Sequence, residues 1–381
     1  MVFFAHISDT HLGFRQYNLR EREQDFYDAF NEAIDKIIKE KVDFVVHSGD
    51  LFESSRPSTE ALLAVLKSVK KLDEKGIKIY AIPGSHDQPR RKGLPPHALF
   101  EQLGVTVLRS SKPFDVFGKK VFIGGVEYTP RAFKKILMSK IEAIASNSKN
   151  YSKRILVLHQ AVQQYLPFDY ELDLSDLPTN FDYYAMGHIH KRLKTNYGRG
   201  ILAYPGSTEV WSKDEYNEYR KNGKGFYIVD LSGDQPYVHE INLENIRPHL
   251  EFKVKSSENF DKEFAKIMEK IRSIRFNKKP VIHLEIKTSS SINRVFLQKL
   301  ISKYIEPYAL GVRWQLEEKP LTPDLLTLEM DKISIKDLLR EFLKDESKAS
   351  FAYELFNLLS QGDIEGAVNQ ARKFYEKGAW K

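Results

Sequence analysis

Short apolar runs alternate with amphipathic stretches over roughly the first 250 residues, and this pattern predicts an α/β fold. Five runs rich in apolar residues read as buried strands, namely FFAHI, DFVVH, IYAI, ILVL and YYAM. Apolar residues at helical spacing from Phe26 to Ile38 predict a helix after the first run. A second helix is expected over 58–75, with Ser58 or Thr59 as its N-cap.

Later segments extend this pattern and then change it. Hairpins and strands are predicted at 115–129 and 200–243, and Arg247-Pro248 marks a predicted boundary. The order then becomes strand, helix, strand, helix, strand, which indicates a small second α/β domain. Pro320 and Pro323 fall in a predicted linker. We therefore expect domains or segments at 1–248, 249–318, 319–333 and 334–381.

The last segment is predicted to be helical and amphipathic. An apolar stripe on a short helical tail has to be buried, either against its own chain or against a partner. We favour the partner. The residues of the stripe include Ile335, Leu338, Leu339, Phe342 and Leu343, then Phe351, Leu355, Leu358 and Leu359.

Composition narrows the class of protein. The 381 residues are 41% hydrophobic and 12% aromatic, which is enough for real cores. No apolar run approaches the roughly 18 residues of a membrane span, and the N-terminus lacks the basic region of a signal peptide. We therefore expect an intracellular, cytoplasmic protein. The absence of cysteine excludes disulfides and thiolate metal sites, and the net charge of +7 favours polyanionic partners.

Asp and His residues gather where the predicted strands end. A lone histidine is usually a surface or satisfied core residue, but this set recurs in order after strand upon strand. The carboxyl ends of strands in an α/β sheet are where binding sites usually form. The candidates are Asp9 and His11 in SDTHLG, Asp50 in SGDLF, Ser85 and His86 in PGSHD, His159 in LVLHQ, and His188 and His190 in MGHIH.

This residue set suits two borderline first-row metal ions. Asp50 is the natural candidate for a ligand that bridges both ions. Two metals roughly 3.5–4 Å apart can activate a water and hold both reacting oxygens of a phosphoester. His188 and His190 are two residues apart, so in a regular strand they would face one side and reach the same site.

These motifs resemble the calcineurin-like metallophosphoesterase superfamily. SDTHLG, GDLF followed by RPS, and YPGSTEV further resemble the DNA double-strand-break repair nucleases of the meiotic recombination protein eleven family, with its bacterial relative SbcD. The resemblance implies a β-sandwich flanked by helices, a small α/β capping domain that contacts DNA, and a helical tail that binds an SMC-like ABC ATPase. It also implies a homodimer and a Mn²⁺-dependent nuclease with 3′–5′ double-strand exonuclease and single-strand endonuclease activity.

The same resemblance assigns roles to single residues. Asp9, His11, Asp50 and His190 would hold one Mn²⁺ ion. Asp50, Ser85, His159 and His188 would hold the other. His86 would not be a ligand but would donate to the phosphate or leaving oxygen as charge develops there. Asp87 either orients His86 or caps the following turn.

Two residues depart from the family's pattern. Ser85 stands where Asn usually binds a metal, and its shorter hydroxyl leaves three readings: weaker metal affinity, preference for a particular metal, or little effect. Glu53 stands where many members carry a His that helps exonuclease action. An acid there cannot donate as an imidazolium and would repel a phosphate, so we expect an altered balance of exonuclease and endonuclease activity.

Basic residues near the motifs predict a rim for a phosphate backbone, with a solvated charged face as the alternative. The strongest charge asymmetry lies at 131–154. Helices at 61–66 and 97–104 are candidates for dimer contacts or for core packing. The predicted DNA contacts are Arg15, Arg20, Arg56, Arg90, Arg91, Lys191 and Arg192, with Arg22 and Lys92 in the same basic segments.

Two other functions compete with the nuclease. The first is a phosphodiesterase or phosphatase of the same superfamily that acts on small substrates or proteins. The second domain, the basic balance and the tail count against it. The second is a non-catalytic scaffold that binds DNA and the ATPase, supported only by Ser85 and Glu53.

Overall fold

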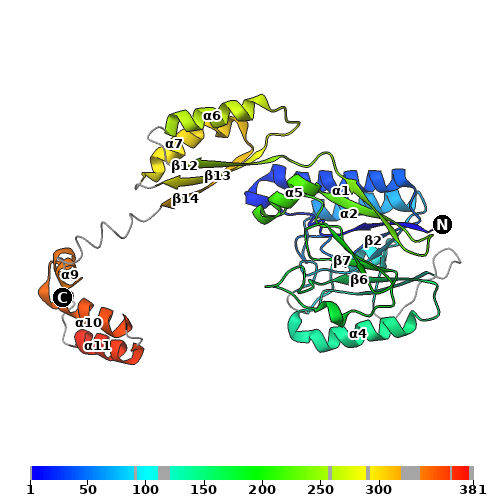
Figure 1. Ribbon diagram of the computed structural model, residues 1–381, viewed down its shortest axis with the longest axis horizontal. Helices are drawn as coiled ribbons and strands as arrows, with labels where there is room; N and C mark the ends of the chain where they lie inside the picture. Colours follow the sequence, from blue (N-terminus) through cyan, green and yellow to red (C-terminus); the bar gives the residue numbers. More distant parts are fainter. Residues whose placement is uncertain are drawn as a thin grey trace. The chain divides into compact units, whose positions relative to one another are not determined.

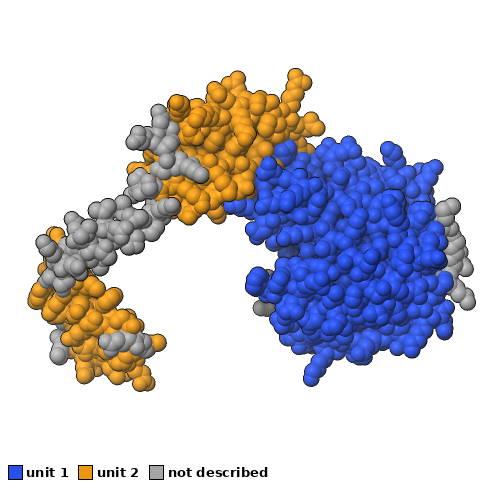
Figure 2. All heavy atoms as spheres, viewed as in Figure 1, with its two compact units in different colours: residues 1–248 blue, residues 249–381 orange. Residues whose placement is uncertain are grey.

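The five apolar runs form central strands of two sheets in a computed structural model of the chain. The structure describes residues 2–89, 92–109, 121–255, 260–288, 292–318, 335–360 and 363–376. The chain divides into two units, Met1–Pro248 and His249–Lys381 (Figure 2).

The first sheet of unit 1 is mixed. Its strand order is β11-β10-β1-β2-β3-β4, with β1 to β4 parallel and β10 antiparallel to both β1 and β11. The strands are β1 (Phe3–Ile7), β2 (Phe44–His47), β3 (Lys78–Ala81), β4 (Thr106–Val107), β10 (Gly225–Asp230) and β11 (Tyr237–Asn242).

The second sheet has the order β5-β6-β7-β9-β8. Neighbours from β5 to β9 are parallel, whereas β8 and β9 form an antiparallel hairpin. The described part of the predicted 115–129 hairpin is therefore a single strand that pairs in parallel with β6. The strands are β5 (Val121–Val126), β6 (Lys153–His159), β7 (Tyr183–Gly187), β8 (Leu193–Tyr197) and β9 (Gly200–Tyr204).

The two sheets share an apolar core. Phe4 and Phe44 of the first sheet stack at 5.0 Å between ring centroids, and Phe4 meets Tyr183 of the second sheet edge-on at 5.3 Å. Helices α1 (Arg20–Glu40) and α2 (Thr59–Asp73) cover the outer face of the first sheet, and α4 (Lys134–Asn147) covers the outer face of the second (Figure 1). The shared core and the covering helices thus hold the strand ends of both sheets in place.

Both predicted helices are present. Ser58 is the N-cap of α2, and its side chain accepts a hydrogen bond from Ala61 N at 3.2 Å. Two shorter helices in unit 1 are α3 (His97–Glu101) and α5 (Tyr216–Asn222). Single 3-10 turns lie at Gln16–Asn18, Arg131–Phe133, Leu174–Asp176, Lys213–Glu215 and Glu306–Tyr308.

Unit 2 has the predicted order of strand, helix, strand, helix, strand. Its parallel sheet runs β12-β13-β14 and buries an apolar face against α6 and α7. The predicted linker at 319–333 lies outside the described residues, and helices follow it. The elements are β12 (His249–Lys255), α6 (Phe260–Ser273), β13 (Val281–Thr288), α7 (Arg294–Tyr304), β14 (Gly311–Glu318), α9 (Ile335–Leu343), α10 (Glu346–Ser360) and α11 (Ile364–Glu376).

The chain is thus an α/β protein with mixed sheets and C-terminal helices. Within the described part of the chain, no helix has the length and apolar character needed to cross a bilayer.

Candidate metal centre

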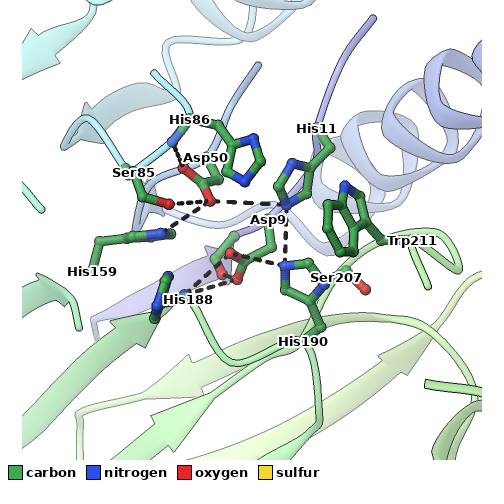
Figure 3. Close-up of polar contacts among 12 residues, drawn as sticks. Asp9, His11, Asp50, Ser85, His86, His159, His188, His190, Ser207 and Trp211 are labelled. Carbon is green, nitrogen blue, oxygen red and sulfur yellow. Dashed lines mark hydrogen bonds and ion pairs between the residues drawn. The ribbon is translucent and has the colours of Figure 1, made fainter. Parts of the chain in front are cut away.

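The predicted ligands converge at the carboxyl ends of strands from both sheets (Figure 3). In the first sheet, these residues lie in the loops after β1, β2 and β3. In the second sheet, they lie at the end of β6 and in the loop after β7. Neighbouring parallel strands direct their carboxyl ends to the same edge, so residues far apart in sequence meet there. The residues brought together are Asp9, His11, Asp50, Ser85, His86, His159, His188 and His190.

Asp9, His11 and His190 form the first ligand group, and they offer ligand atoms within 4.8 Å of one another. His11 Nε2 lies 3.1 Å from His190 Nε2, which lies 3.7 Å from Asp9 Oδ1. His11 Nδ1 is 2.8 Å from Glu53 Oε2. His190 Nδ1 is likewise 2.8 Å from Glu215 Oε1. These carboxylates hold the ring proton on Nδ1 and leave the lone pair of Nε2 available to a metal ion.

Asp50, His159 and His188 form the second ligand group, again within 4.8 Å. His159 Nε2 lies 3.1 Å from Asp50 Oδ2, and His159 Nδ1 donates to the Ser48 carbonyl oxygen at 2.8 Å. The Ser85 hydroxyl donates to Asp50 Oδ2 at 3.2 Å. Ser85 thus reaches this group through the carboxylate.

Asp50 lies between the two groups. Its Oδ2 is 3.1 Å from His159 Nε2 and 3.9 Å from His11 Nε2. Burial alone would raise the pKa of Asp50, but His159 and then His11 hold that pKa well below its usual range. An ionised carboxylate in this place suits a bridging ligand.

The donor set fits divalent first-row cations. His159 Nε2 is buried and makes no hydrogen bond within the described part of the chain, although it faces the Asp50 carboxylate. Burial, assisted by His159, lowers the pKa of His188 to about 3, so this imidazole is neutral at ordinary pH and keeps a lone pair that a metal ion could use. Imidazole nitrogens with carboxylate oxygens and no thiolate are typical of such cations.

The backbone at the ligands is unusual. Asp9, His11, Asp50 and His188 have φ of 51°, 43°, 52° and 90°, in the left-handed region. Gly49 has φ 98°, and a Cβ there would lie 2.3 Å from His159 Nδ1. The glycine before Asp50 is therefore required for the close approach of β2 and β6.

His188 and His190 both reach the site, as expected, but not by facing one side of a strand. We expected His188 and His190 to face one side of a regular strand, but β7 ends at Gly187 and the chain turns at His188. The backbone N–H of His188 donates to Asp9 Oδ1 at 3.1 Å. As a result the two histidines join different ligand groups.

His86 lies beside both groups. Its backbone N–H donates to Asp50 Oδ1 at 2.8 Å, and its ring Nδ1 lies 3.1 Å from the Glu53 carbonyl oxygen. Among the described residues, Asp87 forms no hydrogen bond or ion pair with the His86 ring, and its Oδ2 lies 3.9 Å from His97 Nε2. Instead its carboxylate ties the second and third motif loops together by accepting backbone N–H bonds from Leu51, Phe52 and Gly84.

Sequence reasoning missed Glu215 and Trp211. Glu215 is buried and accepts bonds from His190, Ser207 and Lys224. Burial would raise the pKa of Glu215, but Lys224 and then His190 hold it far below its usual range. The only sequence signal is the S-K-D-E pattern at 212–215, a capping box that is indeed formed but that does not reveal the contact with His190.

The predicted basic rim is only partly exposed. Arg90 and Arg91 lie outside the described residues. The Arg192 prediction conflicts with the structure, because its side chain is 4% exposed and its guanidinium donates to the Asn222 and Ile241 carbonyl oxygens at 2.9 and 2.7 Å. The predicted DNA contacts that lie on the surface are Arg15, Arg20, Arg56 and Lys191.

Arg22 is fully buried and serves the fold. Its guanidinium donates to Asp25 at 2.6 Å and lies 3.3 Å from Glu209 Oε1. Arg247 donates to the same Asp25 carboxylate at 2.5 Å. This cluster joins α1 to the loop that carries Trp211.

The charge asymmetry at 131–154 is smaller in the folded chain than in the sequence. Lys134 pairs with Asp173 at 2.7 Å and Asp176 at 2.6 Å. Lys140 pairs with Glu127 at 2.6 Å. Acids from other segments therefore neutralise part of the basic run.

A groove opens next to His86. Its volume is about 680 Å³, and two cations, Arg56 and Lys92, line it together with Glu53 and Ser85. The other lining residues are Ser54, Ser55, Gln88, Pro89, Gly93 and Leu94. A polar groove with two cations that begins at a metal centre suits a phosphate-bearing chain.

Residues 4–192 match the calcineurin-like phosphoesterase family. This span contains all eight converging residues, so fold and site define a metallophosphoesterase, an enzyme that hydrolyses phosphoesters.

Whole-chain relatives narrow the class. The DNA double-strand break repair protein Mre11 of Methanocaldococcus jannaschii is 39% identical over 344 residues, covering 90% of both chains. The Mre11 proteins of Methanococcus maripaludis and Saccharolobus solfataricus are 38% and 37% identical and cover 96–97% of this chain and 97–98% of their own. The chain belongs to the archaeal Mre11 family of DNA double-strand break repair nucleases. The predicted family and enzyme class are confirmed, and the small-substrate and scaffold alternatives give way to the nuclease.

Proposed function

We propose that the chain is a Mn²⁺-dependent nuclease that processes broken DNA ends as a 3′–5′ double-strand exonuclease and a single-strand endonuclease. The observation that carries this proposal is the position of Asp50, which joins two ligand groups beside His86 and the groove. Asp9, His11 and His190 would hold one ion, and Ser85, His159 and His188 the other, with Asp50 shared between them.

When bound, two such ions supply an activated water and stabilise both reacting oxygens of the phosphodiester. His86 is positioned to act on the same phosphate. The Asp50 carboxylate fixes the His86 backbone, and the Glu53 carbonyl oxygen faces ring Nδ1. With Nδ1 held there, a proton on ring Nε2 would be donated to the leaving oxygen as charge develops on it.

DNA would lie along the groove beside His86. Arg56 and Lys92 line this groove, and Arg20 and Lys191 add exposed positive charge in the motif loops and next to them, whereas Arg15 is paired with Glu23 at 2.7 Å. Contacts of this kind are to the phosphate backbone and carry no sequence information. The logarithm of the affinity should then fall with the logarithm of the salt concentration, by about 0.9 per neutralised phosphate.

Partners are expected at two apolar surfaces. The tail helices expose Phe342, Phe356 and Ile364, which supports docking of 334–381 to an SMC-like ABC ATPase. Exposed leucines on and near α2 and α3 support a homodimer, namely Leu63, Leu66, Leu94, Leu99 and Leu103. Residues 249–318 would serve as a DNA-contacting cap, and the protein would act in the cytoplasm on DNA.

The deciding experiment measures cleavage of labelled duplex DNA by the purified chain with Mn²⁺, Mg²⁺ or EDTA. Manganese-dependent cleavage should fall on the order of a hundredfold or more in His86→Ala, with both ions still bound. Loss of metal from that variant would instead make His86 a ligand. Absence of cleavage by the parent with every metal would contradict an autonomous nuclease.

A further inference from the structure

Glu53 occupies a central place next to the first ligand group. Its backbone N–H donates to the Leu12 carbonyl oxygen at 3.1 Å, which ties the second motif loop to the first. Its carboxylate Oε2 lies 2.8 Å from His11 Nδ1 and accepts from Trp211 Nε1 at 3.0 Å. The Glu53 side chain is 23% exposed, and its second carboxylate oxygen, Oε1, lies 3.6 Å from His86 Nδ1.

The contact with His11 decides which ring nitrogen carries the proton. A carboxylate can only accept, so it fixes N–H at His11 Nδ1 and leaves a lone pair on Nε2. That Nε2 is the atom that points to His190 and Asp50. A carboxylate behind a histidine ligand both orients the ring and strengthens it as a ligand.

The contact with Trp211 places an aromatic wall around the same group. The indole centroid lies 5.6 Å from His11, 5.3 Å from His190 and 6.0 Å from His86. Because one carboxylate oxygen accepts from both rings, His11 and Trp211 cannot shift independently.

We propose that Glu53 is a positioning residue for the first metal ion, which acts by orienting His11 and locking Trp211 against it. The proposal rests on the proposed two-metal function and gives Glu53 a role that it exerts through His11 and Trp211. It also gives Glu53 a role that differs from repulsion of the substrate.

The test is Mn²⁺ binding without DNA, followed by the EPR signal of the free ion. Glu53→Ala should weaken one of the two ions by about 10- to 100-fold and leave the other unchanged. Glu53→Gln keeps the size and one acceptor oxygen, so it should restore part of the affinity. Glu74→Ala, an exposed acid at the end of α2, is the matched control and should bind like the parent.

A double variant shows which ion is affected. His188→Ala removes a ligand of the second group only, so the remaining ion reports on the first group. Adding Glu53→Ala should then weaken that remaining ion by the same 10- to 100-fold factor. Unchanged affinity in the double variant would overturn the proposal.

Two further outcomes separate the causes. A parallel loss of both ions together with a lower melting temperature would also overturn the proposal, since Glu53 would then support the fold. A parent chain that binds two Mn²⁺ ions but leaves DNA intact would contradict the nuclease, while the binding comparison would still decide the role of Glu53.

Discussion

The two ligand groups use the same residue types but are oriented by different partners. In the first group, carboxylates at Glu53 and Glu215 face His11 and His190. In the second group, His159 donates to a neutral carbonyl, and His188 Nε2 lies 4.0 Å from its nearest carboxylate, on Glu171. Charge-assisted hydrogen bonds are roughly twice as strong as neutral ones. Neighbouring carboxylates therefore hold the histidines of the first group in place, whereas the second group receives less support from the residues around it.

His188→Ala is expected to have the largest effect on this difference. Truncation removes the one imidazole of the second group that has no hydrogen-bonded acceptor at its ring within the described chain, so one Mn²⁺ ion should be lost and one retained. Cleavage should fall by about a hundredfold or more, because a two-metal site stabilises both reacting oxygens. Mn²⁺ stoichiometry and the cleavage rate measure this, and two retained ions would show that His188 is no ligand.

His6 supports the second group through Ser48, and it should make the free energy of unfolding depend on pH. Its ring lies 2.8 Å from Ser48 Oγ, and the Ser48 carbonyl holds His159. Burial lowers the pKa of His6 to about 3, below the ordinary value of 6.5. As the pH falls, His6 therefore binds a proton in the unfolded chain before it does so in the folded chain. The stability of the folded chain is complete in this respect above pH 6.5 and is lost as the pH falls toward 3.

Denaturant unfolding of the parent and of His6→Gln at pH 7.5 and pH 5 measures this contribution. The parent should lose about 2 kcal/mol more than the variant between these pH values. Equal losses would mean that His6 is protonated in the folded chain or that other groups dominate.

Glu53→His tests the first group with a smaller expected change. An imidazole can donate to a phosphate, which a carboxylate cannot, so the ratio of exonuclease to endonuclease activity should change several-fold. Rates on blunt duplex and on single-stranded circles give this ratio. An unchanged ratio would remove Glu53 from the choice between the two activities.

Ser85→Asn should strengthen the second group by a small factor. The Ser85 hydroxyl donates to Asp50 and is short for a ligand, whereas an amide oxygen at this place can bind the metal directly. Mn²⁺ affinity at the weaker site should rise a few-fold. Equal affinity in parent and variant would favour the reading in which serine is a variant with little effect.

The sequence predicted that these Asp and His residues converge, because strand ends in an α/β sheet meet at one edge and the motifs mark those ends. It could not predict Glu215 behind His190, since a capping box carries no information about a distant loop. It also overvalued Arg192 and the 131–154 run, because the acceptors of Arg192 and the acids opposite Lys134 come from other parts of the chain. A local sequence pattern does not show which charged residues pair in the folded chain.

The left-handed backbone at Asp9, His11, Asp50 and His188 constrains how this site can evolve. Among residues with a side chain, Asn, Asp and His tolerate that conformation best. Exchanges of Asp for Asn or His therefore remain open to drift, while Glu or a β-branched residue would meet a conformational penalty before any question of metal binding arises. The backbone conformation thus limits which residue types can stand at these positions, and with them the range of metals that proteins descended from this chain can bind.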